Sequence, residues 1–333
     1  MVKQFHSQLK TVGGGEGDRC VYPTRLDMYG CGCQHNCAYC YARSLLDFRG
    51  LWDPEAPSCT DKRTAYRIMD RLRPGEVVRI GGMTDPFQPI EEKYRLTEWA
   101  IGELNKRRIG YLIVTKSALV AKCRNLHPQL AHIQVSYTHS EGMVPEGYEH
   151  ASPPEDRIKA AEDLHARGYD VQLRLSPLVP EYIDLDRVIR SPVDKVLVEF
   201  LRINPFIEKA MPWLDTTAWT HKAGNYRHLP LKAKVDIIAP IIAAGKRVTV
   251  CEDVPEHYDF WRKNVNHNPD DCCDLDIRGR RTHDRDKRRH PAPADRQGSG
   301  YRGGYGGGPR GTVGTPGRAP LPIPAHLCCP AQE

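Results

Sequence analysis

The sequence contains no long hydrophobic run: nowhere in its 333 residues does an uninterrupted apolar stretch approach the roughly 18 residues that a membrane helix needs. The first residues, MVKQFHSQLKTVGGGEG, also lack the apolar stretch of a secretory signal peptide. We therefore expect no membrane insertion and a cytoplasmic location. In that reducing compartment, the twelve cysteines of the chain favour metal ligands or reactive thiols over disulfides.

A surplus of positive charge is also missing from most of the chain, although the formal net charge is +6. Residues 278–333 hold 11 Lys and Arg against 4 Asp and Glu, a net charge of +7, so the other 277 residues carry a net charge of −1. Charge therefore does not predict a nucleic-acid-binding face on the main part of the chain, and it leaves open a local basic patch.

Composition divides the chain into three regions. Residues 1–20 are polar and rich in glycine, which predicts a flexible arm. Residues 279–333 contain 11 Gly and 8 Pro with few large apolar side chains, so we predict a disordered tail over 278–333. Residues 21–277, in a chain whose hydrophobic fraction is 40%, are expected to form one folded domain.

Within this domain, strand-like apolar segments alternate with amphipathic helical segments. The strand candidates are short and rich in β-branched residues, as buried parallel strands are: 25–29, 76–82, 111–116, 132–137, 170–179, 195–203 and 247–253. Helical candidates between them include residues 94–108 and 153–168. This order predicts an α/β fold, a partial or complete parallel barrel, with its chemistry at the carboxyl ends of the strands.

Directly after the first candidate strand, Cys33, Cys37 and Cys40 form a C-x3-C-x2-C motif. Three thiolates in one tight loop can bind three irons of a 4Fe–4S cluster and leave the fourth iron open to a small molecule. The alternative is a structural zinc site in a non-catalytic module that binds nucleic acid through the basic tail. Cys31 could be the fourth zinc ligand, but it lies only one residue from Cys33, unlike the usual C-x2-C pair.

With its surroundings, the motif resembles the radical S-adenosylmethionine (AdoMet) superfamily, in its spore photoproduct lyase-like branch. The similarity runs from about residue 20 to 190, through CQHNCAYCYAR, GGMTDPFQPIEEKYRLT and IVTKS. The resemblance implies a 4Fe–4S cluster whose open iron binds the amino and carboxylate groups of AdoMet. It further implies reductive cleavage of AdoMet to a 5′-deoxyadenosyl radical that abstracts hydrogen from a substrate. A one-electron reductant such as flavodoxin or ferredoxin would be a partner.

Candidate AdoMet-binding residues lie beside the motif and at the strand ends. They are Tyr39, Gly81, Gly82, Thr84, Asp85, Lys116, Ser136 and Arg174. The resemblance implies that Tyr39 contacts the adenine and that the glycine-rich stretch meets the methionine amino group, while Arg174 could pair with its carboxylate. The alternatives are a core aromatic for Tyr39, a β-turn for the glycine stretch and structural hydrogen bonds for the others. Glu199, inside an apolar run, is either a buried ion-pair member or a substrate-binding group.

Three further cysteines, Cys251, Cys272 and Cys273, are candidate catalytic thiols, because a thiol near a radical can donate hydrogen. Metal binding and inert burial are the alternatives. For the substrate, the resemblance points to a thymine-derived nucleobase in DNA. The reaction would be base modification, rearrangement or repair, of lyase or isomerase type. A radical enzyme acting on a peptide or small metabolite is the alternative.

Overall fold

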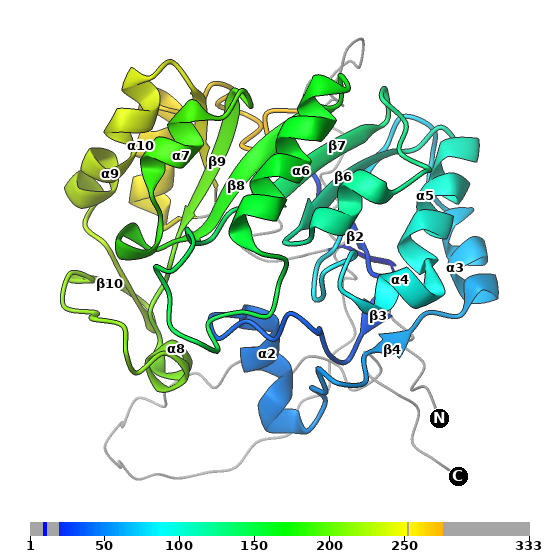
Figure 1. Cartoon of the computed structure of the whole chain (residues 1–333), viewed down its shortest axis with the longest axis horizontal. Helices are drawn as coiled ribbons and strands as arrows, with labels where there is room; N and C mark the ends of the chain where they lie inside the picture. The colour runs from blue at the N-terminus through cyan, green and yellow to red at the C-terminus, as the bar shows by residue number, and fades with distance from the viewer. Residues whose placement is uncertain (1–8, 12–19, 252, 276–333) are drawn as a thin grey trace, which may run out of the picture. The chain divides into compact units, whose positions relative to one another are not determined.

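The computed structural model describes residues 9–11, 20–251 and 253–275, and its main element is an eight-stranded sheet (Figure 1). The strand order is β1-β2-β5-β6-β7-β8-β9-β12. The edge strand β1 (Leu9–Thr11) is antiparallel to β2 (Thr24–Leu26). The remaining strands run parallel to β2 and to one another: β5 (Val77–Ile80), β6 (Gly110–Thr115), β7 (Ala131–Ser136), β8 (Asp170–Leu178), β9 (Lys195–Phe200) and β12 (Arg247–Val250).

This sheet confirms the predicted α/β fold and settles its form. In the part of the chain that the structure describes, no strand pairing joins β12 to β1 or β2, so the barrel is partial. Within the predicted arm, residues 9–11 form β1 and Cys20 is described, whereas the other arm residues lie outside the described ones. The predicted tail, 278–333, lies entirely outside them.

Helices cover one face of the sheet (Figure 1). They are α3 (Lys62–Met69), α4 (Ile90–Tyr94), α5 (Leu96–Lys106), α6 (Pro154–Ala166), α7 (Leu185–Arg190), α9 (Leu231–Ala243) and α10 (Pro255–Asn264). Of these, α5 packs on β6, α6 on β7 and β8, and α9 and α10 on β12. Among the described residues, no helix is long and apolar enough to cross a bilayer.

Shorter elements occupy the loops. They are α2 (Tyr41–Leu46), α8 (Pro205–Ala210), the hairpin β10 (His221–Ala223) and β11 (Tyr226–His228), and the 3-10 turns η1 (Asp47–Arg49), η2 (Ala118–Lys122) and η3 (Pro180–Tyr182). In Figure 1, α2 and α8 lie below the sheet.

The parallel register gives the two faces of the sheet opposite character. Register partners Ile80, Ile113, Ile133 and Val171 belong to the apolar core together with residues of α5 and α6. Because side chains alternate along a strand, the neighbouring positions lie on the other face. That inner face is polar: its register pairs are Arg25 with Arg79, Gln134 with Gln172, and Ser136 with Arg174.

The predicted first strand, residues 25–29, is divided in the structure. β2 ends at Leu26, and Tyr29–Gly30 form β3, which pairs with β4 (Ser58–Cys59) in a separate antiparallel sheet. Between the two strands, the Asp27 carboxylate accepts the backbone N–H of Gly82 at 2.7 Å. The cysteine motif therefore follows β3 rather than a strand of the main sheet.

Candidate active site

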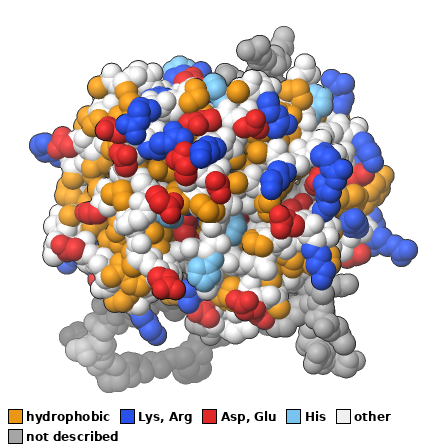
Figure 2. Space-filling view, in the orientation of Figure 1, with side chains coloured by type: hydrophobic (Ala, Val, Ile, Leu, Met, Phe, Trp, Pro, Cys, Tyr) orange, Lys and Arg blue, Asp and Glu red, His pale blue; other side chains and the backbone are white. Residues whose placement is uncertain are grey.

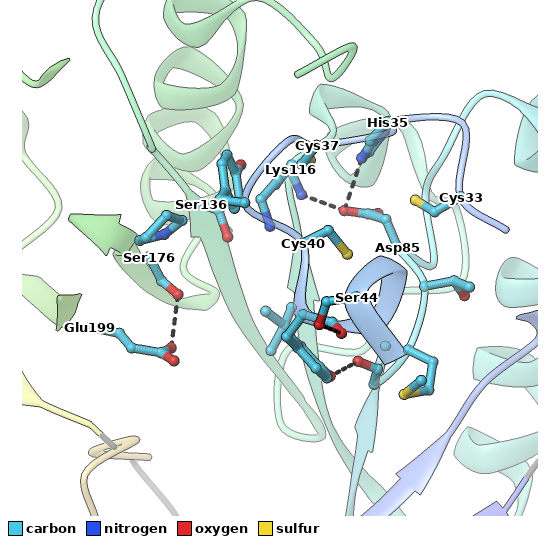
Figure 3. A pocket seen from close by; sticks show the side chains of 18 of the residues that line it. Cys33, His35, Cys37, Cys40, Ser44, Asp85, Lys116, Ser136, Ser176 and Glu199 are labelled. Atoms are coloured by element: carbon cyan, nitrogen blue, oxygen red, sulfur yellow. Dashed lines mark hydrogen bonds and ion pairs between the residues drawn. The ribbon is translucent and has the colours of Figure 1, made fainter. Parts of the chain in front are cut away.

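A cavity of about 420 Å³ lies at the carboxyl ends of the parallel strands. Its wall contains all three cysteines of the motif and all eight residues predicted to bind AdoMet: Tyr39, Gly81, Gly82, Thr84, Asp85, Lys116, Ser136 and Arg174. Figure 3 shows the cysteines on one side of the cavity and Ser176 and Glu199 on the opposite side. The fold therefore places the predicted site residues, which come from separate segments of the sequence, around a single cavity.

The cysteine loop can follow its path only because residue 32 is a glycine. Gly32 has a φ of +151°, and a Cβ there would lie 1.8 Å from the backbone oxygen of Asp53. The backbone N–H of Asp53 in turn donates to the Cys31 carbonyl at 2.9 Å, so the two segments pack without room for a side chain. The loop ends where the Cys40 sulfur accepts the Arg43 N–H at 3.5 Å and α2 begins.

The three thiols lie in surroundings that suit a bound cation. Burial raises the pKa of Cys33 to about 12, with the Asp85 charge acting in the same direction. Burial also raises the pKa of Cys37 well above its ordinary value, and that of Cys40 to a smaller extent. Thiols in this state become thiolates when a metal supplies compensating charge. The soft donor set and the cavity beside it fit a 4Fe–4S cluster.

The part of the chain that the structure describes lacks a preformed site for a single metal ion. Among residues 9–11, 20–251 and 253–275, no three His, Cys, Asp or Glu side chains are grouped so that they could hold a metal ion. A zinc site needs this convergence, because its sulfur ligands lie about 2.3 Å from one ion. In a cubane, each thiolate binds a different iron. Cys31, the candidate fourth zinc ligand, is buried and does not line the cavity.

Asp85, in the glycine-rich loop that follows β5, connects this loop to the end of β6 through hydrogen bonds. Its carboxylate accepts the Thr115 hydroxyl at 2.7 Å and the Lys116 backbone N–H at 2.6 Å, and it lies 3.4 Å from His35 Nδ1 (Figure 3). Burial alone would raise the pKa of Asp85, but His35 and these hydrogen bonds lower it to about 2. Asp85 is thus an ionised carboxylate, and both of its oxygens already accept hydrogen bonds from the protein.

The other residues of this loop are also tightly placed. A Cβ at Gly81 would lie 2.8 Å from the Pro86 ring, and one at Gly82 would lie 2.9 Å from Arg25 Cδ. The Thr84 hydroxyl donates to the Tyr29 carbonyl at 2.9 Å. Neither glycine position has room for a side chain, and both residues line the cavity.

Sequence reasoning missed a buried network behind Tyr39. The Tyr39 hydroxyl donates to Glu149, whose carboxylate also accepts the Thr138 hydroxyl at 2.9 Å and Arg157 at 2.6 Å. Burial would raise the pKa of Glu149, but Arg157 and the hydrogen bond from His139 lower it well below the usual range. The network thus holds an ionised carboxylate at the hydroxyl of Tyr39, the residue that lies between Cys37 and Cys40 in sequence.

The backbone around Glu149 also binds the cysteine loop directly. The Ala38 N–H donates to the Tyr148 carbonyl at 2.9 Å, and the His150 N–H donates to the His35 carbonyl at 2.7 Å. A signal for this network exists in α6, where Arg157 lies on the stripe of Ala161 and Leu164. A charged residue on an apolar helix face requires a buried partner, although its identity is not readable from sequence.

The remaining predicted residues, which also line the cavity, are Lys116, Ser136 and Arg174. Lys116 Nζ lies 5.6 Å from the centre of the Tyr39 ring. The buried Ser136 hydroxyl has no hydrogen-bond partner among the described residues. Arg174 donates to Glu199 at 2.5 Å and to Gln134 at 2.9 Å, so Glu199 is an ion-pair member that also lines the cavity.

Cys251, Cys272 and Cys273 do not line the cavity. The Cys272 and Cys251 sulfurs lie 3.3 Å apart, and both Cys272 and Cys273 are buried. The hydrogen bond with Cys272 lowers the pKa of Cys273, and the charges of Arg174 and Arg79, which do line the cavity, act in the same direction. The role of these thiols as hydrogen donors stays a prediction.

Their segment, residues 266–275, connects the two ends of the sheet. Asn266 exchanges hydrogen bonds with the backbone of Val250 in β12, at 2.8 and 3.2 Å. Asp271 accepts the hydroxyl of Tyr22, just before β2, at 2.6 Å. The segment therefore folds back onto the domain, as hydrogen donation by Cys272 or Cys273 to a substrate would require.

No protein-family model matches the chain. An uncharacterized protein of Methanocaldococcus jannaschii is 30% identical over 161 residues, which cover 47% of this chain and 61% of that protein. An uncharacterized protein of Mycobacterium bovis is 28% identical over 166 residues, which cover 46% of this chain and 49% of that protein. The chain thus spans less than two thirds of the length of the curated relatives it matches.

Solved structures of spore photoproduct lyase share the fold. A double mutant of that enzyme with bound AdoMet and dinucleoside spore photoproduct has a TM-score of 0.54 at 16% identity, covering 74% of this chain and 80% of that one. A second structure, complexed with the dinucleoside spore photoproduct, has a TM-score of 0.51 at 15% identity, covering 73% and 78%. The likeness confirms the predicted resemblance at the level of the fold: the chain shares the fold of these structures of spore photoproduct lyase.

Proposed function

We propose that this chain is a radical AdoMet enzyme, which cleaves AdoMet reductively and abstracts hydrogen from a substrate. The observation that carries the proposal is the composition of the cavity wall. The C-x3-C-x2-C cysteines and all eight candidate AdoMet-binding residues line the same cavity at the carboxyl ends of the strands. That edge of a parallel α/β barrel is where catalytic residues gather.

In this proposal Cys33, Cys37 and Cys40 hold a 4Fe–4S cluster. When bound, the cluster supplies the single electron that breaks the AdoMet sulfonium bond, taken from a reductant such as flavodoxin or ferredoxin. Tyr39, fixed from behind by Glu149, forms the adenine contact. The backbone at Gly81 and Gly82 receives the methionine amino group.

In this proposal Ser136, Lys116 and Arg174 also bind AdoMet. The Ser136 hydroxyl, buried without a protein partner among the described residues, is available to a ligand acceptor. Lys116 contributes a half-buried cation: burial acts to lower its pKa, but the charges of Cys37, Glu149 and Asp85 raise it. Arg174 offers one donor group to the methionine carboxylate while Glu199 holds it in place.

For the substrate we propose a thymine-derived nucleobase in DNA, with base modification, rearrangement or repair as the reaction, of lyase or isomerase type. The support is the likeness in fold to spore photoproduct lyase, whose structures contain a dinucleoside spore photoproduct. Cys251, Cys272 and Cys273 are the proposed source of a returned hydrogen atom.

Anaerobic reconstitution tests the cofactor part of the proposal. Wild-type protein is expected to bind about four irons and four sulfides per chain and, after reduction, to form 5′-deoxyadenosine from AdoMet. Cys33→Ala, Cys37→Ala and Cys40→Ala should each abolish both properties. Cys59→Ala, in β4 and outside the cavity wall, is the control and should keep both. A Cys33→Ala protein that still forms 5′-deoxyadenosine would overturn the assignment.

A further inference from the structure

Four cysteines that do not line the cavity come together from three separate segments of the chain. Cys20 precedes β2, Cys251 follows β12, and Cys272 and Cys273 belong to the segment 266–275. The Cys272 thiol donates to the Cys251 sulfur at 3.3 Å and is also within hydrogen-bond reach of Cys273. Burial raises the pKa of Cys20 to about 11, and the charges of the nearby Cys273 and Cys251 act in the same direction. The four thiols therefore form one group.

Cys251 extends β12 directly beside the cavity wall. Its backbone N–H donates to the Val198 carbonyl at 2.9 Å, which continues the pairing of β12 with β9. Because Val250 is the register partner of Val198, Cys251 lies opposite Glu199, the next residue of β9. Glu199 lines the cavity, so Cys251 neighbours the candidate site without belonging to its wall.

The segment that carries Cys272 is held in place by hydrogen bonds between side chains and backbone. Asn266 accepts the Val250 N–H at 2.8 Å and donates to the Val250 carbonyl at 3.2 Å. The Asp271 carboxylate accepts the backbone N–H of Cys273 at 2.9 Å. These bonds hold the backbone on both sides of Cys272, so the contact between the two sulfurs is a consequence of the fold.

The sulfurs of Cys251 and Cys272 need little movement to form a covalent bond. A disulfide has an S–S distance of about 2.0 Å, so these sulfurs, at 3.3 Å, are about 1.3 Å too far apart. Rotation about one Cα–Cβ bond can move a sulfur farther than that. For the adjacent residues Cys272 and Cys273, the Cα atoms are only about 3.8 Å apart, whereas disulfides usually need at least about 4.4 Å. The geometry therefore favours a bond between Cys251 and Cys272.

Thiol chemistry suits this group better than the binding of a single metal ion. Within the described ranges, no three side chains of His, Cys, Asp or Glu are arranged to hold a metal ion. Cys251 is half-buried, whereas Cys272 is only 8% exposed. An oxidant therefore reaches Cys251 first, and Cys272 is placed to react with the oxidised sulfur.

The oxidant that fits this position is small and uncharged. On the face of the molecule shown in Figure 2, acidic and basic side chains are interspersed, so that face does not favour an oxidant of either charge. Hydrogen peroxide is small and neutral and oxidises cysteine thiolates, which suits a half-buried thiol.

We propose that Cys251 and Cys272 are a redox-sensitive thiol pair that hydrogen peroxide converts to a disulfide. The Cys251 thiolate attacks one peroxide oxygen, the O–O bond breaks, and hydroxide leaves Cys251 as a sulfenic acid. The Cys272 sulfur then attacks the Cys251 sulfur, the S–O bond breaks, and water leaves with the Cys272 proton. Two thiols are thus oxidised by two electrons, and one peroxide is reduced to two waters. A dithiol reverses the reaction by exchange.

The disulfide changes the domain in two ways. It joins the segment 266–275 covalently to the end of β12, where hydrogen bonds alone hold it in the reduced protein. It also removes the thiol hydrogen of Cys272. Under the proposed function, on which this second effect rests, the oxidised protein still cleaves AdoMet but cannot return a hydrogen atom from Cys272. Reversible disulfides of this kind are the ones expected in a reducing compartment.

Mass spectrometry tests the thiol pair directly. Cluster-loaded wild-type protein is treated anaerobically with an equimolar amount of hydrogen peroxide, and the remaining thiols are blocked with N-ethylmaleimide before digestion. We expect the link between Cys251 and Cys272 to be the main disulfide and to return to thiols with dithiothreitol. A main link between Cys272 and Cys273, or no link at all, overturns the proposal.

Variants assign the order of the two steps. Cys272→Ser should form no link and should accumulate a sulfenic acid at Cys251, which dimedone traps. Cys251→Ser should leave Cys272 as a thiol under the same treatment. Cys123→Ser is the matched control, because Cys123 is a buried cysteine at the end of η2, and it should form the link as the wild type does. A sulfenic acid that accumulates at Cys272 in Cys251→Ser overturns the proposed order.

Thermal unfolding measures the covalent joining of the segment. The link spans 21 positions of sequence, and closing a loop of that length should raise the Tm of the wild type by at least about 4 °C relative to peroxide-treated Cys272→Ser. Dithiothreitol should remove the increase. An unchanged Tm in fully linked protein overturns the joining of the segment to β12.

The thiol pair and the proposed function can fail separately. If the link forms in a protein that makes no 5′-deoxyadenosine even before oxidation, the thiol pair stands and the proposed function fails. If 5′-deoxyadenosine is made and the link does not form, the thiol pair is wrong. Iron well above four per chain that falls in Cys251→Ser would mean that these thiols hold a second cluster, which also overturns the proposal.

Discussion

Replacing Glu149 by alanine tests the buried network behind Tyr39. The side chains of Glu149 and Arg157 are 2% and 0% exposed, so solvent screens their ion pair little. Removing one partner of such a pair costs about 3–5 kcal/mol, because the other charge is left buried. Arg157 keeps the Ser136 carbonyl at 3.1 Å and the Thr138 hydroxyl at 3.2 Å, which places the expected cost of Glu149→Ala near the lower end.

A cost of about 3 kcal/mol is a large part of the roughly 5–15 kcal/mol that stabilises a typical domain. For a domain of this size each kcal/mol shifts the Tm by about 2–4 °C, so Glu149→Ala should lower the Tm by about 6–12 °C. Differential scanning calorimetry of the anaerobic protein measures the shift. Glu149→Gln should lose less, since its amide oxygen still accepts the Tyr39 hydroxyl.

The double variant Glu149→Ala, Arg157→Met provides the decisive comparison. Because it removes both charges, it should be no less stable than Glu149→Ala alone, and the two single effects should not add. A Tm for Glu149→Ala within about 2 °C of the wild type would refute the reasoning, on the scale of about 2–4 °C per kcal/mol. Fully additive losses in the double variant would refute it as well.

Three further predictions concern the loop, the acid stability and the distal thiols. Gly32→Ala should bind far less iron than the wild type because its Cβ meets the Asp53 carbonyl, whereas Gly50→Ala, at positive φ but in open space, should bind a normal amount in an iron assay. Burial acts to raise the pKa of Asp170, but His132 and Lys195 lower it from 3.8 to about 2, so this carboxylate stabilises the fold above about pH 4 and loses that effect as the pH falls towards 2. Urea unfolding measures the free energy of unfolding at each pH. Between pH 4 and pH 2 this free energy should fall by about 2 kcal/mol less in Asp170→Asn than in the wild type. An equal fall in the two proteins would contradict the ion pairing. Cys272→Ser, Cys273→Ser should keep its iron and its AdoMet cleavage but yield less product per 5′-deoxyadenosine, and unchanged coupling would make both thiols bystanders.

Much of the fold was predictable because buried parallel strands are short apolar runs. The segments at 111–116 and 132–137 became β6 and β7 within one residue at each end. The members of the cavity wall were predictable for a related reason: the carboxyl ends of parallel strands meet at one edge, so residues that follow different strands, such as Gly81 and Lys116, come together.

Contacts between residues that are far apart in the sequence could not be predicted. Glu149 accepts a hydrogen bond from Tyr39, 110 residues away in sequence, and the sequence around neither residue predicts this contact. Asp27, which lies between β2 and β3, accepts a hydrogen bond from Gly82, 55 residues away in sequence. Likewise, Arg25 and Arg79 become neighbours only through the register of β2 with β5. Each of these depends on tertiary geometry rather than on local propensity.

Electron paramagnetic resonance of the reduced cluster tests the central claim most directly, because it asks whether AdoMet reaches an iron that no cysteine binds. In reconstituted protein reduced under anaerobic conditions, adding AdoMet should change the spectrum of the cluster held by Cys33, Cys37 and Cys40. S-adenosylhomocysteine, which lacks the sulfonium methyl group, serves as the comparison ligand. A reduced 4Fe–4S spectrum that stays the same at saturating AdoMet would contradict the account, as would a protein that binds zinc and no iron.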